Sequence, residues 1–174
     1  MILRMKDQVK KEFYEHATQS LLKQLNTMGL GSDEKRNAIF YTKLFRETFK
    51  YDEIKKYMFV TKESKIWDLG YDSAGFCRIA SATFSLVMGV KDWELRCVDA
   101  NQWHGNASHH YLRHIPSGQF FDLTYDQFAV EGLSVPYEIG TQAAYQLAHS
   151  DIMKFTDILN IDVVGILKGA HKRS

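Results

Sequence analysis

The sequence predicts an α+β fold, in which helices come first and a small antiparallel sheet follows in the second half of the chain. Apolar residues recur at helical spacing in the first third, a proline-free helical stretch lies near the middle, and three strand-like runs come after it. A chain of 174 residues with 45% hydrophobic content can bury one substantial core. We therefore predict a single domain over residues 1–174, with an N-terminal helical part at about 5–60, a core at about 65–135 and a helical tail at 141–174.

The overall charge gives no reason to expect nucleic acid or a membrane as a partner. Lysine and arginine number 22 against 21 acidic residues, so the protein carries no strong field of either sign. No apolar run approaches the roughly 20 residues of a membrane helix. Met1-Ile2-Leu3-Arg4 leads into charged sequence and not into a signal-peptide core. We expect a cytoplasmic protein.

Two amphipathic helices are predicted in the first third of the chain, followed by a shorter one from Tyr51 to Tyr57. Gly29-Leu30-Gly31 ends the first, and Ser32 is placed to cap the second, which runs to about Phe49. The apolar positions are Val9, Phe13, Ala17, Leu21 and Leu25 in the first helix, and Ile39, Phe40, Leu44, Phe45 and Phe49 in the second. Such stripes are typical of core packing, and we assign them no chemistry.

A central helix is predicted from Phe76 to Met88, with Gly89 placed to end it. Cys77 would lie in its first turn, directly after the turn-forming residues Asp72-Ser73-Ala74-Gly75. Unpaired backbone N–H groups and the positive end of the helix dipole stabilise a thiolate there, and they can also hydrogen-bond a developing oxyanion. Arg78 would add a favourable charge if its side chain turned toward the sulfur. This is the setting of a reactive thiol.

The second cysteine has a different setting. Cys97 lies in the alternating run Trp93 to Val98, which is typical of a small buried strand residue. Two cysteines do not make a disulfide framework, and we expect both to be reduced. We assign chemistry to Cys77 only.

Three strand-like runs follow the central helix, at Trp93–Ala100, His109–Ile115 and Gln119–Leu123. Pro116-Ser117-Gly118 forms a tight connection between the last two, which predicts an antiparallel hairpin. Such pairing would place His109 or His110 at the start of one strand and Asp122 near the end of its partner. From Thr141 the chain reads as helix to about Leu159, followed by a short apolar run.

The chain thus supplies a thiol, an imidazole and a carboxylate. A thiol attacks carbonyls as the thiolate, so an imidazole must take its proton, and a carboxylate must hold the imidazole in the useful tautomer. Because adjacent strand residues point to opposite faces, only one of His109 and His110 is expected to face Cys77. Asp126 is a rival to Asp122, but Asp122 lies in the apolar run where a buried carboxylate belongs.

These residues resemble the papain-like cysteine protease superfamily, and most closely its transglutaminase-like branch. The likeness covers about Trp67 to Phe128. It consists of a helix that begins at a cysteine, a strand with His-x-aromatic-aliphatic at His109–Leu112, and a strand with apolar-Asp-Leu-Thr at Phe121–Thr124. Members include transglutaminases, cysteine peptidases, amidases and deamidases.

The resemblance implies a catalytic triad of Cys77 as nucleophile, His109 as base and acid, and Asp122 as the residue that orients the imidazole, with His110 as second choice for the base. The implied activity is that of a thiol protease or a related hydrolase or transferase, acting on an amide carbonyl of a protein or peptide through a thioester at the cysteine. Hydrolysis and acyl transfer both remain open, and no cofactor is needed. The alternative is a catalytically inactive member of the fold that serves as a protein-binding module.

The sequence departs from the family pattern at the oxyanion hole. Papain-type peptidases place a glutamine several residues before the cysteine, whereas the equivalent stretch here, Gly70 to Ser73, has none. A backbone N–H, the Tyr71 hydroxyl or the Trp67 indole could supply the second donor, and Trp103 could line a substrate cleft. The histidine motif has Tyr111 where tryptophan is commoner. No calcium-loop signature is present, so we do not expect calcium activation.

Four histidines crowd one short region, and imidazole is a common zinc ligand. They are His104, His109, His110 and His114. Their spacing matches no standard metal motif, and strand alternation separates two of them. We therefore predict no metal site.

Overall fold

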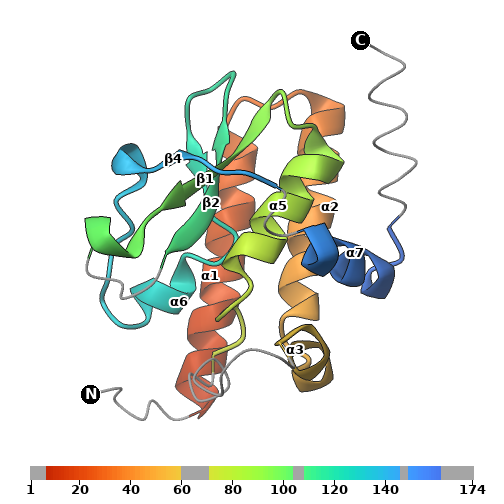
Figure 1. The fold of residues 1–174 in the computed structure, drawn as a ribbon, viewed down its shortest axis with the longest axis vertical. Helices are drawn as coiled ribbons and strands as arrows, with labels where there is room; N and C mark the ends of the chain where they lie inside the picture. Colours follow the sequence, from red (N-terminus) through yellow and green to blue (C-terminus); the bar gives the residue numbers. More distant parts are fainter. Residues whose placement is uncertain (1–6, 60–70, 104–107, 146–148, 162–174) are drawn as a thin grey trace.

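The computed structural model describes residues 7–59, 71–103, 108–145 and 149–161, and in these residues the chain is a mixed α+β protein (Figure 1). The α-helices are α1 (Asp7–Thr27), α2 (Ser32–Thr48), α3 (Asp52–Phe59), α5 (Cys77–Met88), α6 (Asp126–Ala129) and α7 (His149–Ile158). The strands are β1 (Trp93–Val98), β2 (His109–His114), β3 (Phe120–Phe121) and β4 (Thr141–Gln142). Two short 3₁₀ helices, η1 (Ala100–Gln102) and η2 (Tyr137–Ile139), lie in the connections. No helix in this described part is long and apolar enough to cross a membrane.

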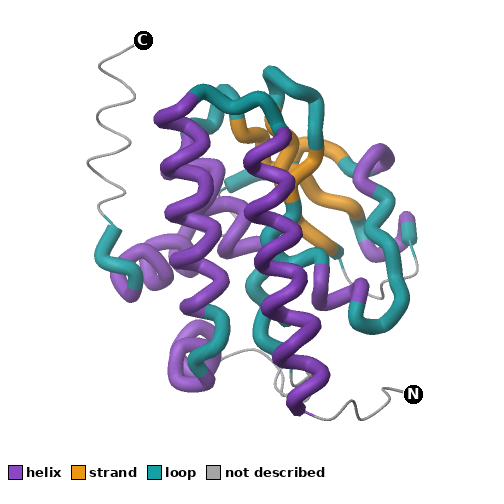
Figure 2. The backbone as a smooth tube through the Cα atoms, turned by 180° about the vertical axis from the view of Figure 1, so that it is seen from behind, coloured by secondary structure: helices purple, strands orange, loops and turns teal. Residues whose placement is uncertain are grey.

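The N-terminal helices α1 and α2 stand side by side on one face of the fold, the face nearest the viewer in Figure 2. Both were predicted, and so was α3. Gly31, not Ser32, occupies the N-cap of α2, and no side chain caps it. The predicted stripes are buried in part: Leu25 and Phe45 are fully buried, whereas Val9 is 43% and Phe40 is 58% exposed. The buried face of each helix therefore includes fewer residues than the apolar spacing predicted.

The sheet is antiparallel with strand order β3-β2-β1-β4. The predicted hairpin is present, because Leu112 of β2 pairs with Phe121 of β3 and with Leu95 of β1. Strand β3 is shorter than predicted because the chain turns at Asp122, whose Oδ1 accepts a hydrogen bond from the Thr124 backbone N–H at 3.0 Å. The turn places the carboxylate just beyond the sheet edge.

The C-terminal part differs from the prediction of a helix from Thr141. Thr141 and Gln142 instead form β4, which pairs with Cys97 and Arg96 of β1, and α7 begins only at His149. An unpaired strand edge offers backbone hydrogen-bonding groups, and this segment satisfies part of the edge of β1. The predicted apolar run beyond Ile161 lies outside the described residues.

Helix α5 packs against β1 and β2 on one side and against α2 and α7 on the other. Its first turn is fixed by Phe76, which is fully buried and stacks on Phe49, the C-cap residue of α2, with the ring centroids 4.4 Å apart. Phe59 of α3 packs edge-on against the same ring at 5.1 Å. Burying a phenylalanine contributes about 1.5–3 kcal/mol, so these rings hold the start of α5 firmly in the core. The residue that follows Phe76 is Cys77.

Candidate active site

Helix α5 was predicted from Phe76 to Met88 and begins one residue later, at Cys77, so Cys77 lies in its first turn as predicted. The turn before it contains Gly75 at φ +84°, a conformation that glycine adopts readily and other residues rarely do. Cys77 is half-buried, and both cysteines are free. The first backbone N–H groups of an α-helix have no partner within the helix, so Cys77 lies beside unused donors.

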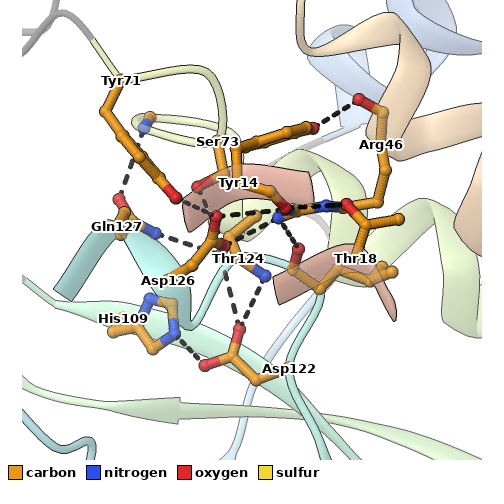
Figure 3. A network of polar contacts seen from close by, with 12 residues as sticks. Tyr14, Thr18, Arg46, Tyr71, Ser73, His109, Asp122, Thr124, Asp126 and Gln127 are labelled. Carbon is orange, nitrogen blue, oxygen red and sulfur yellow. Dashed lines mark hydrogen bonds and ion pairs between the residues drawn. The ribbon is translucent and has the colours of Figure 1, made fainter. Parts of the chain in front are cut away.

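His109 and Asp122 form a buried pair (Figure 3). The His109 Nε2 and Asp122 Oδ2 atoms are 2.6 Å apart. His109 Nδ1 is also buried and makes no regular hydrogen bond within the described part of the chain. This leaves Nδ1 for the Cys77 thiol, with which the imidazole interacts. The structure therefore brings Cys77, His109 and Asp122 together in that order.

The electrostatics of the three groups favour charge separation between sulfur and imidazole. Burial raises the pKa of the Cys77 thiol, but hydrogen bonding to His109 and His110 and their charges more than offset this and lower the pKa to about 5. Burial lowers the pKa of His109, and the Asp122 carboxylate together with the thiolate raises it to about 10. Between these values the pair is a thiolate beside an imidazolium. The thiolate is the form of cysteine that acts as a nucleophile.

The expectation that only one histidine faces the thiol is wrong. Strand alternation does separate the two, because His110 shares the face of Leu112, which packs toward α5, and His109 shares the face of Tyr111. Both imidazoles nevertheless interact with Cys77. Asp122 bonds only His109 of the two. The hydrogen bond to Asp122 thus singles out His109, whereas the interaction with the sulfur is common to both histidines.

Aromatic rings enclose the imidazole of His109. Phe128 packs edge-on against it with the ring centroids 4.7 Å apart, and Tyr111 and Trp103 lie at 6.2 and 6.3 Å. Trp103, predicted as a cleft residue, therefore lies beside the pair. These rings keep water from the His109–Asp122 hydrogen bond, and a low local dielectric strengthens it.

Two further sequence expectations fail in the structure. The Tyr71 hydroxyl, suggested as an oxyanion donor, donates instead to Asp126 Oδ2 at 2.6 Å, and Tyr71 is buried in the core. Arg78 turns away from the sulfur and pairs with Asp151 of α7 at 3.2 Å. The other suggested donor, Trp67, lies outside the described residues.

A buried ion pair between Arg46 and Asp126 was missed by the sequence reasoning, which weighed Asp126 only as a rival to Asp122. Arg46 donates to both carboxylate oxygens, at 2.7 and 3.0 Å, and the two side chains are 1% and 0% exposed. Its guanidinium also donates to the carbonyl oxygens of Leu123 and Tyr14 and lies over the Tyr14 ring at 3.8 Å. The available signal was an arginine between Phe45 and Phe49 on the buried stripe of α2.

This ion pair connects the N-terminal helices to both halves of the site. On the cysteine side, Asp126 accepts hydrogen bonds from the Tyr71 and Ser73 hydroxyls, which precede Cys77 by a few residues. On the carboxylate side, Arg46 bonds the carbonyl of Leu123, the residue after Asp122. Gln127 adds a second link, since its side chain accepts from the Gly75 N–H at 3.5 Å and donates to Thr124 Oγ1 at 3.0 Å.

A cavity of about 460 Å³ lies behind the carboxylate. It is lined by Ser20, Leu21, Gln24, Gln119, Phe120, Asp122, Tyr125 and Tyr137. A second, of about 510 Å³, lies beside α1 and is lined mainly by charged residues. Neither of these two cavities is lined by a residue of α5. The first reaches the site only through Asp122.

Within the ranges that the structure describes, no group of three histidine, cysteine or acidic residues is placed to hold a metal ion. His104, one of the four crowded histidines, lies outside these ranges.

Comparisons of this chain with known proteins identified no similar protein. No protein-family model, no curated protein and no solved structure matches this chain. The case for a function therefore depends on the geometry of the site.

Proposed function

We propose that the protein is a thiol-dependent hydrolase or acyltransferase of papain-like arrangement, which acts on an amide carbonyl of a protein or peptide through a thioester at Cys77. One observation supports this above all. A thiol at the start of a helix lies beside an imidazole that is hydrogen-bonded, on its other nitrogen, to the buried carboxylate of Asp122. A catalytic triad consists of a nucleophile, a base and a group that orients the base, and these three residues contact one another in that order.

In the proposed reaction the Cys77 thiolate adds to the carbonyl carbon of the substrate. The developing oxyanion is stabilised by the first N–H groups of α5 and by the positive end of its dipole. The His109 imidazolium then donates its proton to the departing amine. With a pKa of about 10, the imidazolium is close in acidity to an alkylammonium ion, so this transfer is nearly balanced.

The thioester leaves a neutral His109, which takes a proton from the incoming nucleophile as that nucleophile attacks the acyl carbon. Water gives hydrolysis, and an amine gives acyl transfer. In both cases the C–S bond breaks, and the Cys77 thiolate is restored beside the His109 imidazolium. Asp122 holds the ring in position throughout, and the surrounding aromatic side chains limit competing solvent near the pair.

The test is acylation by a p-nitrophenyl ester of a small amide-bearing acid. We expect a burst of about one equivalent of nitrophenol per protein, an acyl mass on the Cys77 peptide, and continued turnover that an added amine alters. Cys77→Ser should abolish the burst, and Cys97→Ser, the matched control, should keep it. No Cys77-dependent release of nitrophenol, either as a burst or in steady turnover, would refute the proposal. Acylation with no turnover in water or amine would instead make the protein a non-catalytic binding module.

A further inference from the structure

Tyr137 reaches the candidate triad from a distant part of the chain. It lies in η2 and is half-buried. Its hydroxyl donates to Asp122 Oδ2 at 2.9 Å. This is the same oxygen that bonds His109 Nε2 at 2.6 Å. Two donors therefore share one carboxylate oxygen, while Thr124 takes the other.

The segment that carries Tyr137 is held against the sheet at several points. The Tyr111 hydroxyl donates to the Tyr137 carbonyl at 2.6 Å, and the Tyr137 ring stacks on Phe120 with the centroids 5.6 Å apart. Further along, Arg96 donates to the carbonyl of Gly140, and the next two residues form β4. Residues 137–142 thus form a strap from the carboxylate to the edge of β1.

Gly140 is required for the strap to lie this close. A Cβ at this position would overlap the Tyr111 hydroxyl and press on the Cys97 carbonyl. The sequence around Gly140 thus allows the approach that delivers the Tyr137 hydroxyl to Asp122.

We propose that Tyr137 is a positioning residue, whose hydroxyl fixes Oδ2 of Asp122 and moderates the hydrogen bond between that oxygen and His109. The inference depends on the proposed function, because it assigns Tyr137 to the same triad. A carboxylate oxygen that accepts a bond from a second donor is a weaker acceptor for the first. The hydroxyl therefore limits how strongly Asp122 holds the imidazolium proton, and so keeps His109 a competent acid.

Tyr137 also covers Asp122 on the side of the 460 Å³ cavity, which both residues line. The titratable groups around the His109–Asp122 pair are the Cys77 thiol, the His110 imidazole and the hydroxyls of Tyr111, Tyr125 and Tyr137. Among these, the Tyr137 hydroxyl is the one that donates to the carboxylate and can be removed without touching the thiol or the imidazole.

The experiment compares full-length wild type with Tyr137→Phe by NMR of protein labelled with ¹⁵N-histidine. The readouts are the downfield His109 Nε2–H proton and the titration of the His109 ring. Tyr125→Phe is the matched control, since Tyr125 lines the same cavity but its hydroxyl bonds Ser20 and not Asp122. We expect Tyr137→Phe to move the proton further downfield and to raise the His109 pKa by about half a unit or more.

Gly140→Ala should reproduce this change by displacing the strap. Identical His109 spectra and titrations in wild type and Tyr137→Phe would overturn the inference, and so would an equal change in Tyr125→Phe. These readouts need no substrate, so the two proposals fail separately. If Cys77 is acylated but the Tyr137→Phe spectrum is unchanged, only the inference fails. If the spectrum changes but Cys77 is never acylated, only the proposed activity fails.

Discussion

Replacing His109 by alanine should shift the pH dependence of alkylation at Cys77 to higher pH. In wild type the pKa of the thiol is about 5, whereas an ordinary cysteine has a pKa of about 8.5. Removal of the Asp122-bound imidazole removes the main opposing influence on a thiol whose burial by itself raises the pKa. We therefore expect the midpoint of the alkylation rate to move up toward the ordinary value.

The size of the effect follows from two opposing factors. At pH 5.5 about three quarters of a thiol of pKa 5 is ionised, against roughly 0.1% of an ordinary one, a ratio of roughly 750. A thiolate of lower pKa is also a weaker nucleophile, by roughly 40-fold over this interval for a Brønsted slope near 0.45. The variant should thus react roughly 20-fold more slowly at pH 5.5, equally fast near about pH 7, and roughly 20-fold faster near about pH 8.5.

The assay is iodoacetamide labelling from pH 4 to 10, with the modified peptides quantified by mass spectrometry. Cys97 is an internal reference, because burial and the nearby Asp99 charge raise its pKa to about 11. His110→Ala is the matched variant, and its midpoint should stay closer to wild type because Asp122 bonds His109. Superimposable curves for wild type and His109→Ala, without a crossing, would refute the reasoning.

Three further predictions concern stability. Asp126→Asn leaves the buried Arg46 charge without its counter-ion and should lower the free energy of unfolding by about 3–5 kcal/mol in urea titrations; a loss under about 1 kcal/mol would contradict the role of the pair. Gly140→Ala should lower the free energy of unfolding by about 1–3 kcal/mol in the same assay, because the added methyl group overlaps the Tyr111 side chain. An unchanged midpoint would show that residues 137–142 can move to accept the methyl group without loss of stability. Wild type should be most stable relative to Cys77→Ala between about pH 6.5 and 8.5. The lowered pKa of the thiol gives stability that is lost as the pH falls toward 5. The raised pKa of the imidazole gives stability that is lost as the pH rises toward 10. Melting temperatures across this range test it, and a constant difference between the two proteins would count against a thiolate–imidazolium pair.

Local patterns predicted the helices and the hairpin because the deciding information lies within a few residues. Helix α5, from Cys77 to Met88, is an example, since Gly75 precedes it and Gly89 caps its end. Strand β4 was missed for the opposite reason. Thr141 and Gln142 are extended because the edge of β1 pairs with them, and nothing in their own sequence requires it.

The candidate site shows the same division. The order of Cys77, His109 and Asp122 along the chain indicated that they would meet, and in the structure they lie together. The hydrogen bond from Tyr137 and the pairing of Arg46 with Asp126 join segments that no short pattern connects. Sequence periodicity cannot predict such contacts, because tertiary packing decides which polar side chains are buried together.

The separation of Arg46 from Asp126 has a consequence for synthesis. The two residues are 80 positions apart, so a ribosome must add the whole of α5 and the first three strands before the ion pair can close. The imidazole and the carboxylate that ionise Cys77 likewise arrive only with residues 109 and 122. A growing chain therefore carries an ordinary thiol, which is mostly protonated near neutral pH. Its sulfur is held as a thiolate near neutral pH only when the fold that surrounds it is complete.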